Sequence, residues 1–301
     1  MKLNIDKKDF AQPDPYVISD NGKYYMYATG ADGVQLYTSD NMIDWHYAGL
    51  CRKSSGEKQY WAPAVIKIEN SYYMYYSSMP AEATDAHTEQ LRVAVCDRPD
   101  GEFSFLCNLC VPFSIDAHVI KNSEGLYIFY SVNDCLSNRA GTLIVVDKMI
   151  SPTQAANNPK IVVRPTLDEE IFMRDRFFKG QDWHTIEGAF YFRHGDYHYI
   201  MYSGNCYENE NYFIGYSVAK GDTDKLETLD FKKYPNDNTY LPFKCKGGNE
   251  EGTGHNSVLC ENGRYYMFYH ARAVGDLKPN TESRRAYMAD IVPDNGVLHL
   301  K

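Results

Sequence analysis

Three carboxylate side chains stand at matching places in a chain that repeats itself. Asp14, Asp116 and Glu187 each lie at the start of a strand-like segment that leads into a Tyr-rich stretch. Carboxyl groups that lie close together repel one another when ionised, and this repulsion raises the pKa of one of them. One group can then donate a proton at neutral pH while another accepts one, so the pattern is typical of general acid–base chemistry.

The Tyr-rich stretch occurs five times. Each copy follows a turn rich in Asn, Gly, Asp or Ser and is followed by another strand-like segment, as expected for hairpins. With three or four strands per unit, five units predict an all-β fold, a five-bladed β-propeller, because radial repetition leaves only short sheet edges exposed. The copies are GKYYMYATG at 22–30, NSYYMYYSS at 70–78, EGLYIFYSV at 124–132, GDYHYIMYSG at 195–204 and NGRYYMFYHA at 262–271.

Superposing the five copies identifies one position that recurs before each of them. In the fourth unit the matching position is Gly188, and it becomes Glu187 if the hairpin turn of that unit is one residue longer. Equivalent residues at the start of the innermost strands of a propeller converge on one end of its central channel. We therefore expect three carboxyls to meet there, as the cleavage of glycosidic bonds requires. The recurring position is Asp14, Ala62, Asp116, Glu187 and His255.

Composition narrows the class of protein. Tyr accounts for 26 of 301 residues, which favours strands. The net charge of −9 argues against a nucleic-acid partner, which requires clustered Lys and Arg. No stretch approaches the ~20 apolar residues of a membrane span, and the N-terminus lacks a signal-peptide core, so we expect a cytoplasmic protein or a mature form that has lost its leader. The eight irregularly spaced cysteines are interpreted as reduced thiols.

Five further motifs carry a family resemblance. They resemble the blade-opening motifs of glycoside hydrolase family 43, whose members are inverting enzymes on a five-bladed propeller. The resemblance covers nearly the whole chain, so we expect a single catalytic domain over residues 1–301. The motifs are PDPYV at 13–17, WAPAV at 61–65, SIDAHVIK at 114–121, TIEGAFYF at 185–192 and GTGHNSV at 252–258.

The resemblance implies a role for four residues. Asp14 matches the family's general base, Asp116 its pKa-modulating and orienting aspartate, and Glu187 its general acid. His255 matches a histidine near the channel centre that in many members helps to hold a hydrated calcium or another ion. Two departures, EGA at 187–189 and WAPAV in the second unit, leave the three carboxylates unchanged.

Sugar contacts are predicted at aromatic and arginine side chains. A sugar ring packs its C–H face on an aromatic plane, and Trp61 stands next to the Ala62 position. Trp183 is interpreted either as a pocket wall or, equally well, as a core aromatic. Arg285 resembles the family's substrate-facing arginine on the last blade, although its neighbour Arg284 matches almost as well.

The predicted activity is release of a terminal pentose from short arabino- or xylo-oligosaccharides. An α-L-arabinofuranosidase is the first choice, a β-D-xylosidase the second and an endo-arabinanase the third. A non-catalytic sugar-binding or protein-docking propeller and a fructan-active relative stay open. No cofactor is required by this chemistry, although the resemblance suggests a calcium or other ion in the channel, and no oligomeric state is indicated.

Overall fold

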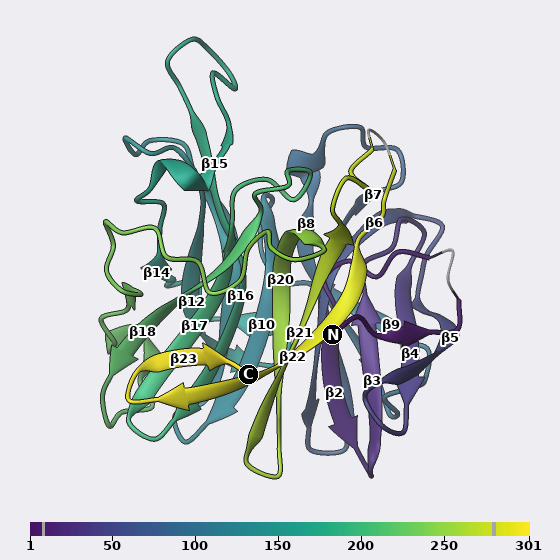
Figure 1. Cartoon of the computed structure of the whole chain (residues 1–301). Helices are drawn as coiled ribbons and strands as arrows, with labels where there is room; N and C mark the ends of the chain where they lie inside the picture. The colour runs from purple at the N-terminus through teal and green to yellow at the C-terminus, as the bar shows by residue number, and fades with distance from the viewer. Residues whose placement is uncertain (8–9, 279–280) are drawn as a thin grey trace.

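The chain folds into antiparallel sheets that stand side by side as the blades of a propeller (Figure 1). The computed structural model describes residues 1–7, 10–278 and 281–301. In these ranges helical structure is limited to three short 3-10 turns. None of the helices described there is long and apolar enough to cross a bilayer.

The first two blades follow one another directly along the chain. The first blade consists of β2 (Tyr16–Asp20), β3 (Lys23–Ala28), β4 (Val34–Ser39) and β5 (Asp44–Arg52), with the short strand β1 (Asn4–Ile5) pairing in parallel with β5. The second blade consists of β6 (Glu57–Ile68), β7 (Ser71–Pro80), β8 (Gln90–Cys96) and β9 (Ser104–Asn108), with the turn η1 (Ala86–Thr88) before β8.

The third and fourth blades are joined at one edge, where β12 and β16 pair in parallel over two residues. The third consists of β10 (Ser114–Asn122), β11 (Gly125–Asp134) and β12 (Gly141–Ser151), with β13 (Gln154–Ala155) and β14 (Lys160–Val163) both on β12. The fourth consists of β15 (Ile171–Met173), β16 (Trp183–His194), β17 (Tyr197–Gly204), β18 (Phe213–Lys220) and β19 (Lys232–Lys233), with the turns η2 (Asp168–Glu170) and η3 (Leu226–Thr228).

The fifth blade closes the ring against the first. It consists of β20 (Glu250–Glu261), β21 (Arg264–Ala273), β22 (Arg285–Asp294) and β23 (Val297–Leu300). The N-terminal residues run along β22, where the Leu3 amide donates to the Ala286 carbonyl at 3.0 Å, and then continue into β1 of the first blade. The start of the chain therefore ties the last blade to the first, and Figure 1 shows these two blades side by side.

The buried core is divided among the five interfaces between neighbouring blades. Each core cluster draws its residues from two adjacent blades, and the fifth and first blades share one as the other pairs do. Successive side chains of a strand point to opposite faces. Tyr27 thus packs between the first and second blades, whereas its neighbour Met26 packs between the first and fifth. A strand buried on both faces needs an unbroken run of large side chains, which explains the five aromatic copies.

Each innermost strand has a left-handed residue at the equivalent blade-opening position, which lies shortly before β2 and inside β6, β10, β16 and β20. In the second to fifth blades the register with the neighbouring strand shifts at this residue. A side chain with positive φ is strained, and such residues gather at functional sites. The residues are Asp14 (φ 54°), Ala62 (43°), Asp116 (60°), Gly188 (67°) and His255 (36°).

Candidate active site

The fourth blade departs by one residue from the predicted series of equivalent positions. Gly188 holds the left-handed position, and Glu187 precedes it, opposite Ser203 in the ladder. A Cβ at position 188 would lie 3.1 Å from the ring of His255, and φ is +67°, so both the space and the backbone favour glycine there. The carboxyl group comes instead from Glu187, which still lines the same cavity.

One cavity collects residues from all five blades. Its volume of about 630 Å³ lies within the usual range for small-molecule sites. The three predicted carboxylates line it together with His255 and Trp61. The sequence therefore identified residues that the fold does bring to one place, although they are spread over 242 positions of the chain, from Asp14 to His255.

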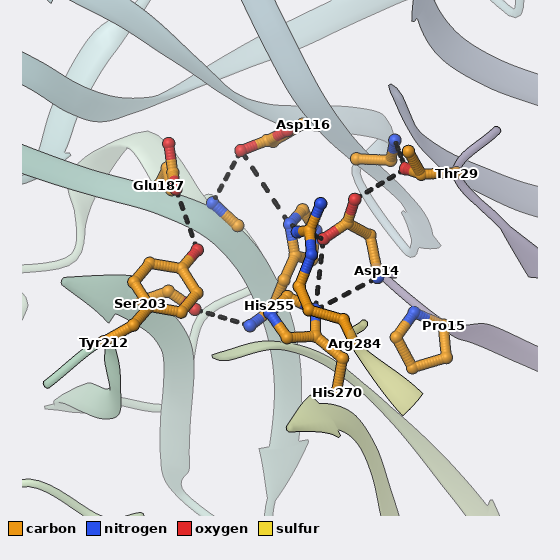
Figure 2. A network of polar contacts seen from close by, with 12 residues as sticks. Asp14, Pro15, Thr29, Asp116, Glu187, Ser203, Tyr212, His255, His270 and Arg284 are labelled. Atoms are coloured by element: carbon orange, nitrogen blue, oxygen red, sulfur yellow. Dashed lines mark hydrogen bonds and ion pairs between the residues drawn. The ribbon is translucent and has the colours of Figure 1, made fainter. Parts of the chain in front are cut away.

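Asp14 is buried and is held by four side chains (Figure 2). The Thr29 hydroxyl donates to its Oδ2 at 2.5 Å, and Arg284 Nη1 donates to its Oδ1 at 3.3 Å. The Nδ1 atoms of His255 and His270 lie 3.5 and 3.3 Å from the same Oδ1. Burial would raise the pKa of Asp14, but the positive charge of Arg284 outweighs this and holds the pKa well below its ordinary value. Asp14 is thus an ionised carboxylate.

The arginine of the site is Arg284, which corrects the choice of Arg285. Arg284 is buried, lines the cavity and bridges Asp14 to Glu282, whose carboxylate it binds through Nε and Nη2. Its guanidinium also lies over the Tyr207 ring, 4.7 Å from the centroid. Arg285 begins β22, where it pairs with Ala271, and does not line the cavity. Strand alternation sends the two neighbouring side chains in different directions.

Glu187 faces the cavity from the fourth blade. The Tyr212 hydroxyl donates to Glu187 Oε1 at 2.8 Å (Figure 2). Burial raises the pKa of Glu187 to about 7, and the charge of Asp14 adds to this, whereas the hydrogen bond from Tyr212 and the charge of Arg284 act in the opposite direction. Glu187 can therefore carry a proton near neutral pH, on Oε2, because Oε1 accepts the Tyr212 hydroxyl.

Asp116 is close enough to the other two carboxyls for the charge of each to affect its pKa. It accepts the Gly188 backbone N–H on Oδ2 at 3.1 Å. Burial raises its pKa well above the usual range, and the charges of Glu187 and Asp14 raise it further. The like-charge repulsion predicted for this pair is therefore seen chiefly at Asp116, whereas burial is the main cause of the raised pKa of Glu187.

His255 stands close to both aspartates. Its Nδ1 lies 3.5 Å from Asp14 Oδ1 and 4.0 Å from Asp116 Oδ2, and its backbone N–H donates to Ser203 Oγ at 2.7 Å. Burial lowers the pKa of His255 although the charge of Asp14 opposes this, so the ring is neutral at pH 7.

The two predicted tryptophans have different surroundings. Trp61 lines the cavity, as expected for a sugar-contacting aromatic. Trp183 is buried and does not line it, because Phe177 and Arg176 of the segment between β15 and β16 cover its ring at 5.4 and 4.9 Å. Trp183 is therefore a buried side chain outside the cavity and does not form one of its walls.

The side chains around His255 do not form a direct metal site. Within the described ranges no group of three or more His, Cys, Asp and Glu residues is arranged to hold a metal ion. His255 would contribute one protein ligand, so an ion in the channel would have to be bound mainly through water. Such an ion stays a prediction from the sequence.

Sequence reasoning missed three residues that contact the carboxyls. Thr29 and His270 contact Asp14, and Tyr212 contacts Glu187. Thr29 and His270 occupy the matching place in their aromatic strands, so the repeat itself marked them. Tyr212 begins the segment that leads into β18, where no repeated motif singled it out.

Comparisons with known proteins agree on one family. The sequence model of the family described as Glycosyl hydrolases family 43 matches residues 9–294. A thermostable family-43 glycoside hydrolase of known crystal structure is 27% identical in sequence to this chain. The two structures superpose with a TM-score of 0.79, and the match covers 97% of this chain and 93% of that chain.

Two curated fungal relatives are similar at lower identity. Alpha-L-arabinofuranosidase B of Pyricularia oryzae is 22% identical over 289 residues, which are 88% of this chain and 55% of that protein. Probable arabinan endo-1,5-alpha-L-arabinosidase A of Aspergillus clavatus is 24% identical over 212 residues, 64% of this chain and 58% of that protein. The chain thus spans a little more than half the length of these two relatives.

Proposed function

Because the chain belongs to glycosyl hydrolase family 43, we propose that it is an inverting glycosidase that releases terminal L-arabinofuranose from short arabinose-containing oligosaccharides. The observation that carries this proposal is the contrast between Asp14 and Glu187. The two carboxyls face one cavity, yet the pKa of Asp14 is lowered and that of Glu187 is raised to about 7. Two similar groups with opposite pKa shifts are suited to opposite proton transfers.

Glu187 is the general acid in this mechanism. It must arrive protonated, and the proton on Oε2 passes to the leaving glycosidic oxygen as the bond to the anomeric carbon breaks. Tyr212 holds Oε1, so the protonated oxygen has a fixed place. Burial keeps the proton on Glu187 at a pH at which an exposed Glu would have lost it.

Asp14 is the general base. It takes a proton from a water molecule that attacks the anomeric carbon from the face opposite the leaving group, and this geometry inverts the anomeric configuration. Arg284 and Thr29 keep the carboxylate ionised and oriented. Asp116 orients the acid's surroundings through Gly188 N–H, and the cluster needs no further cofactor for these steps.

Arabinose is proposed as the sugar because both curated relatives carry arabinose-linkage activities in their names. Trp61 provides an aromatic face in the cavity for a sugar ring, and Arg284 and Tyr207 form another part of its lining. The endo-acting relative supports an endo-arabinanase as the second candidate, since it matches this chain at similar identity. A β-D-xylosidase is the third.

The test is kcat/KM of the purified protein on p-nitrophenyl α-L-arabinofuranoside and p-nitrophenyl β-D-xyloside, with Asp14→Asn as the blank. We expect turnover of the arabinofuranoside, lowered by several orders of magnitude in the blank. A higher value on the xyloside would reverse the choice of sugar. Turnover of linear arabinan alone would favour the endo-acting candidate, and no turnover of any of the three would contradict the proposal.

A further inference from the structure

One place in the aromatic strand holds a hydroxyl in four blades and an imidazole in the fifth. Each of these residues lies opposite the residue just before the left-handed one, as Ser203 lies opposite Glu187 and His270 opposite Gly254. The chain thus departs from its own repeat at the blade that adjoins Asp14. The residues are Thr29, Ser77, Ser131, Ser203 and His270.

In two of the hydroxyl blades this side chain fixes the backbone of the next blade. Thr29 Oγ1 accepts the Ala62 N–H at 2.8 Å, and Ser203 Oγ accepts the His255 N–H at 2.7 Å. Ala62 and His255 are both left-handed residues, so the bond holds a strained conformation in place. In these two blades the hydroxyl therefore fixes the left-handed residue of the following blade, whereas the buried Ser77 and Ser131 hydroxyls have no such partner among the residues that the structure describes.

His270 performs the same task for Asp14. The Asp14 N–H donates to His270 Nδ1 at 3.1 Å across the interface that closes the ring. Because Nδ1 accepts this bond, the neutral ring carries its proton on Nε2. His270 is completely buried, and burial lowers its pKa to about 4, which agrees with a neutral ring.

The imidazole also does something that a hydroxyl could not. Its ring stacks on the ring of Tyr212, with centroids 5.8 Å apart and planes 7° apart. Tyr212 also covers Gly254, the ladder partner of His270, so closely that a Cβ there would lie 1.8 Å from Tyr212 Cε1. The Tyr212 hydroxyl then donates to Glu187. The ring of His270 therefore packs against Tyr212, the residue whose hydroxyl is bonded to Glu187.

We propose that His270 is a positioning residue for both candidate catalytic carboxyls: its Nδ1 fixes the backbone of Asp14, and its ring supports Tyr212 and, through Tyr212, Glu187. This inference rests on the proposed function. It explains why the repeat changes from hydroxyl to imidazole at this blade alone. The charged and titratable groups that act on His270 are Asp14, His255, Arg284, Glu282 and Tyr212.

Three substitutions separate the two tasks. His270→Thr introduces the hydroxyl that Thr29 and Ser203 use and keeps an acceptor for the Asp14 N–H, but it loses the ring. His270→Val has the shape of Thr without the acceptor. His270→Phe keeps a ring for Tyr212 and loses the acceptor.

The readout is kcat on two substrates, a p-nitrophenyl pentoside and the corresponding methyl pentoside. The p-nitrophenolate group leaves with little protonation by the general acid, whereas the methoxide group must be protonated as it leaves. On the activated substrate we expect His270→Val to fall about tenfold to a hundredfold below His270→Thr, because small displacements of a catalytic group cost rates of this order. His270→Thr and His270→Val should both lose additional rate on the methyl pentoside. His270→Phe should lose equally on both substrates.

Equal rates for His270→Thr and His270→Val would overturn the Asp14 part, and the same ratio between the two substrates in all three variants and the wild type would overturn the Tyr212 part. If His270→Val does not fold, His270→Thr and His270→Phe against the wild type still decide both parts. A wild-type protein that is inactive on both pentosides contradicts the proposed function instead. A wild type that is active beside indistinguishable variants contradicts this inference alone.

Discussion

The Tyr212 hydroxyl donates a 2.8 Å hydrogen bond to Oε1 of Glu187. Glu187 is the carboxyl to which the acid role is assigned, and this bond determines which of its oxygens is free to carry the proton. The bond also lowers the pKa of Glu187 against the larger effect of burial. Tyr212 thus sets both the place and the strength of the acid.

Removal of this hydroxyl should weaken the acid. In Tyr212→Phe the pKa of Glu187 rises because a contact that lowers it is lost, so the alkaline limb of the kcat/KM profile should move to higher pH. The plateau rate on a methyl arabinofuranoside should fall by about tenfold to a hundredfold, because the hydroxyl no longer stabilises the carboxylate that forms as Glu187 gives up its proton. Tyr216→Phe is the control, since its hydroxyl accepts from the Leu298 N–H away from the cavity. A limb that stays in place in Tyr212→Phe would contradict this role.

The wild-type profile of kcat/KM should be controlled by Glu187 on its alkaline side. The acid works only when protonated, so activity should be lost as the pH rises through about 7. The base works only when ionised, and its lowered pKa places the acidic limb below that of an ordinary aspartate. Measuring kcat/KM from pH 4 to 9 follows the alkaline limb, and no acidic limb should appear within this range. An optimum above pH 8 would contradict the assignment of the acid.

Arg284 should prove essential and Arg285 should not. In Arg284→Met the pKa of Asp14 rises because its main positive neighbour is gone, and the pKa of Glu187 rises for the same reason, so both limbs should move to higher pH. Loss of the buried ion pair should also lower the free energy of unfolding by about 3–5 kcal/mol. Arg285→Met is the matched control, and urea unfolding with the pH profile measures both effects. Equal effects of the two substitutions would show that Arg284 has no special role.

Gly188 should not tolerate a side chain. In Gly188→Ala the new Cβ meets the His255 ring at 3.1 Å and also has a positive φ, so we expect a loss of stability of about 1–3 kcal/mol and a clear fall in kcat/KM. Gly263→Ala provides the comparison, since φ at Gly263 is +75° and nothing lies within 4 Å of its Cβ position. It should lose stability from backbone strain without losing activity. A fully active Gly188→Ala would show that His255 can move freely.

The repeat allowed the fold and much of the site to be predicted from the sequence. The aromatic strand is repeated because each copy is buried in two blade interfaces, and its register correctly aligned Asp14, Ala62, Asp116 and His255. The family match and the cores at each interface support the five-bladed propeller.

The remaining features depend on contacts that counting along the chain cannot detect. A Cβ at position 188 would crowd the His255 ring and would sit on a left-handed backbone, and the carboxyl of the fourth blade comes from the preceding residue, Glu187. Trp183 is covered by Phe177 from a neighbouring segment, so its spacing from Glu187 did not reveal its burial. Arg284 and Arg285 differ only in the direction of their side chains. Tyr212 begins the strand-like segment that follows the fourth aromatic copy, and nothing in the pattern of that segment indicates its contact with Glu187.

The central claim is that Asp14 activates water on the face opposite the leaving group protonated by Glu187. The most direct test is to follow hydrolysis of an α-L-arabinofuranoside by proton NMR and to read the anomeric configuration of the sugar before it mutarotates. The account predicts that β-L-arabinofuranose is formed first. If α-L-arabinofuranose appears first, the configuration is retained, and the assignment of Asp14 as a general base is wrong.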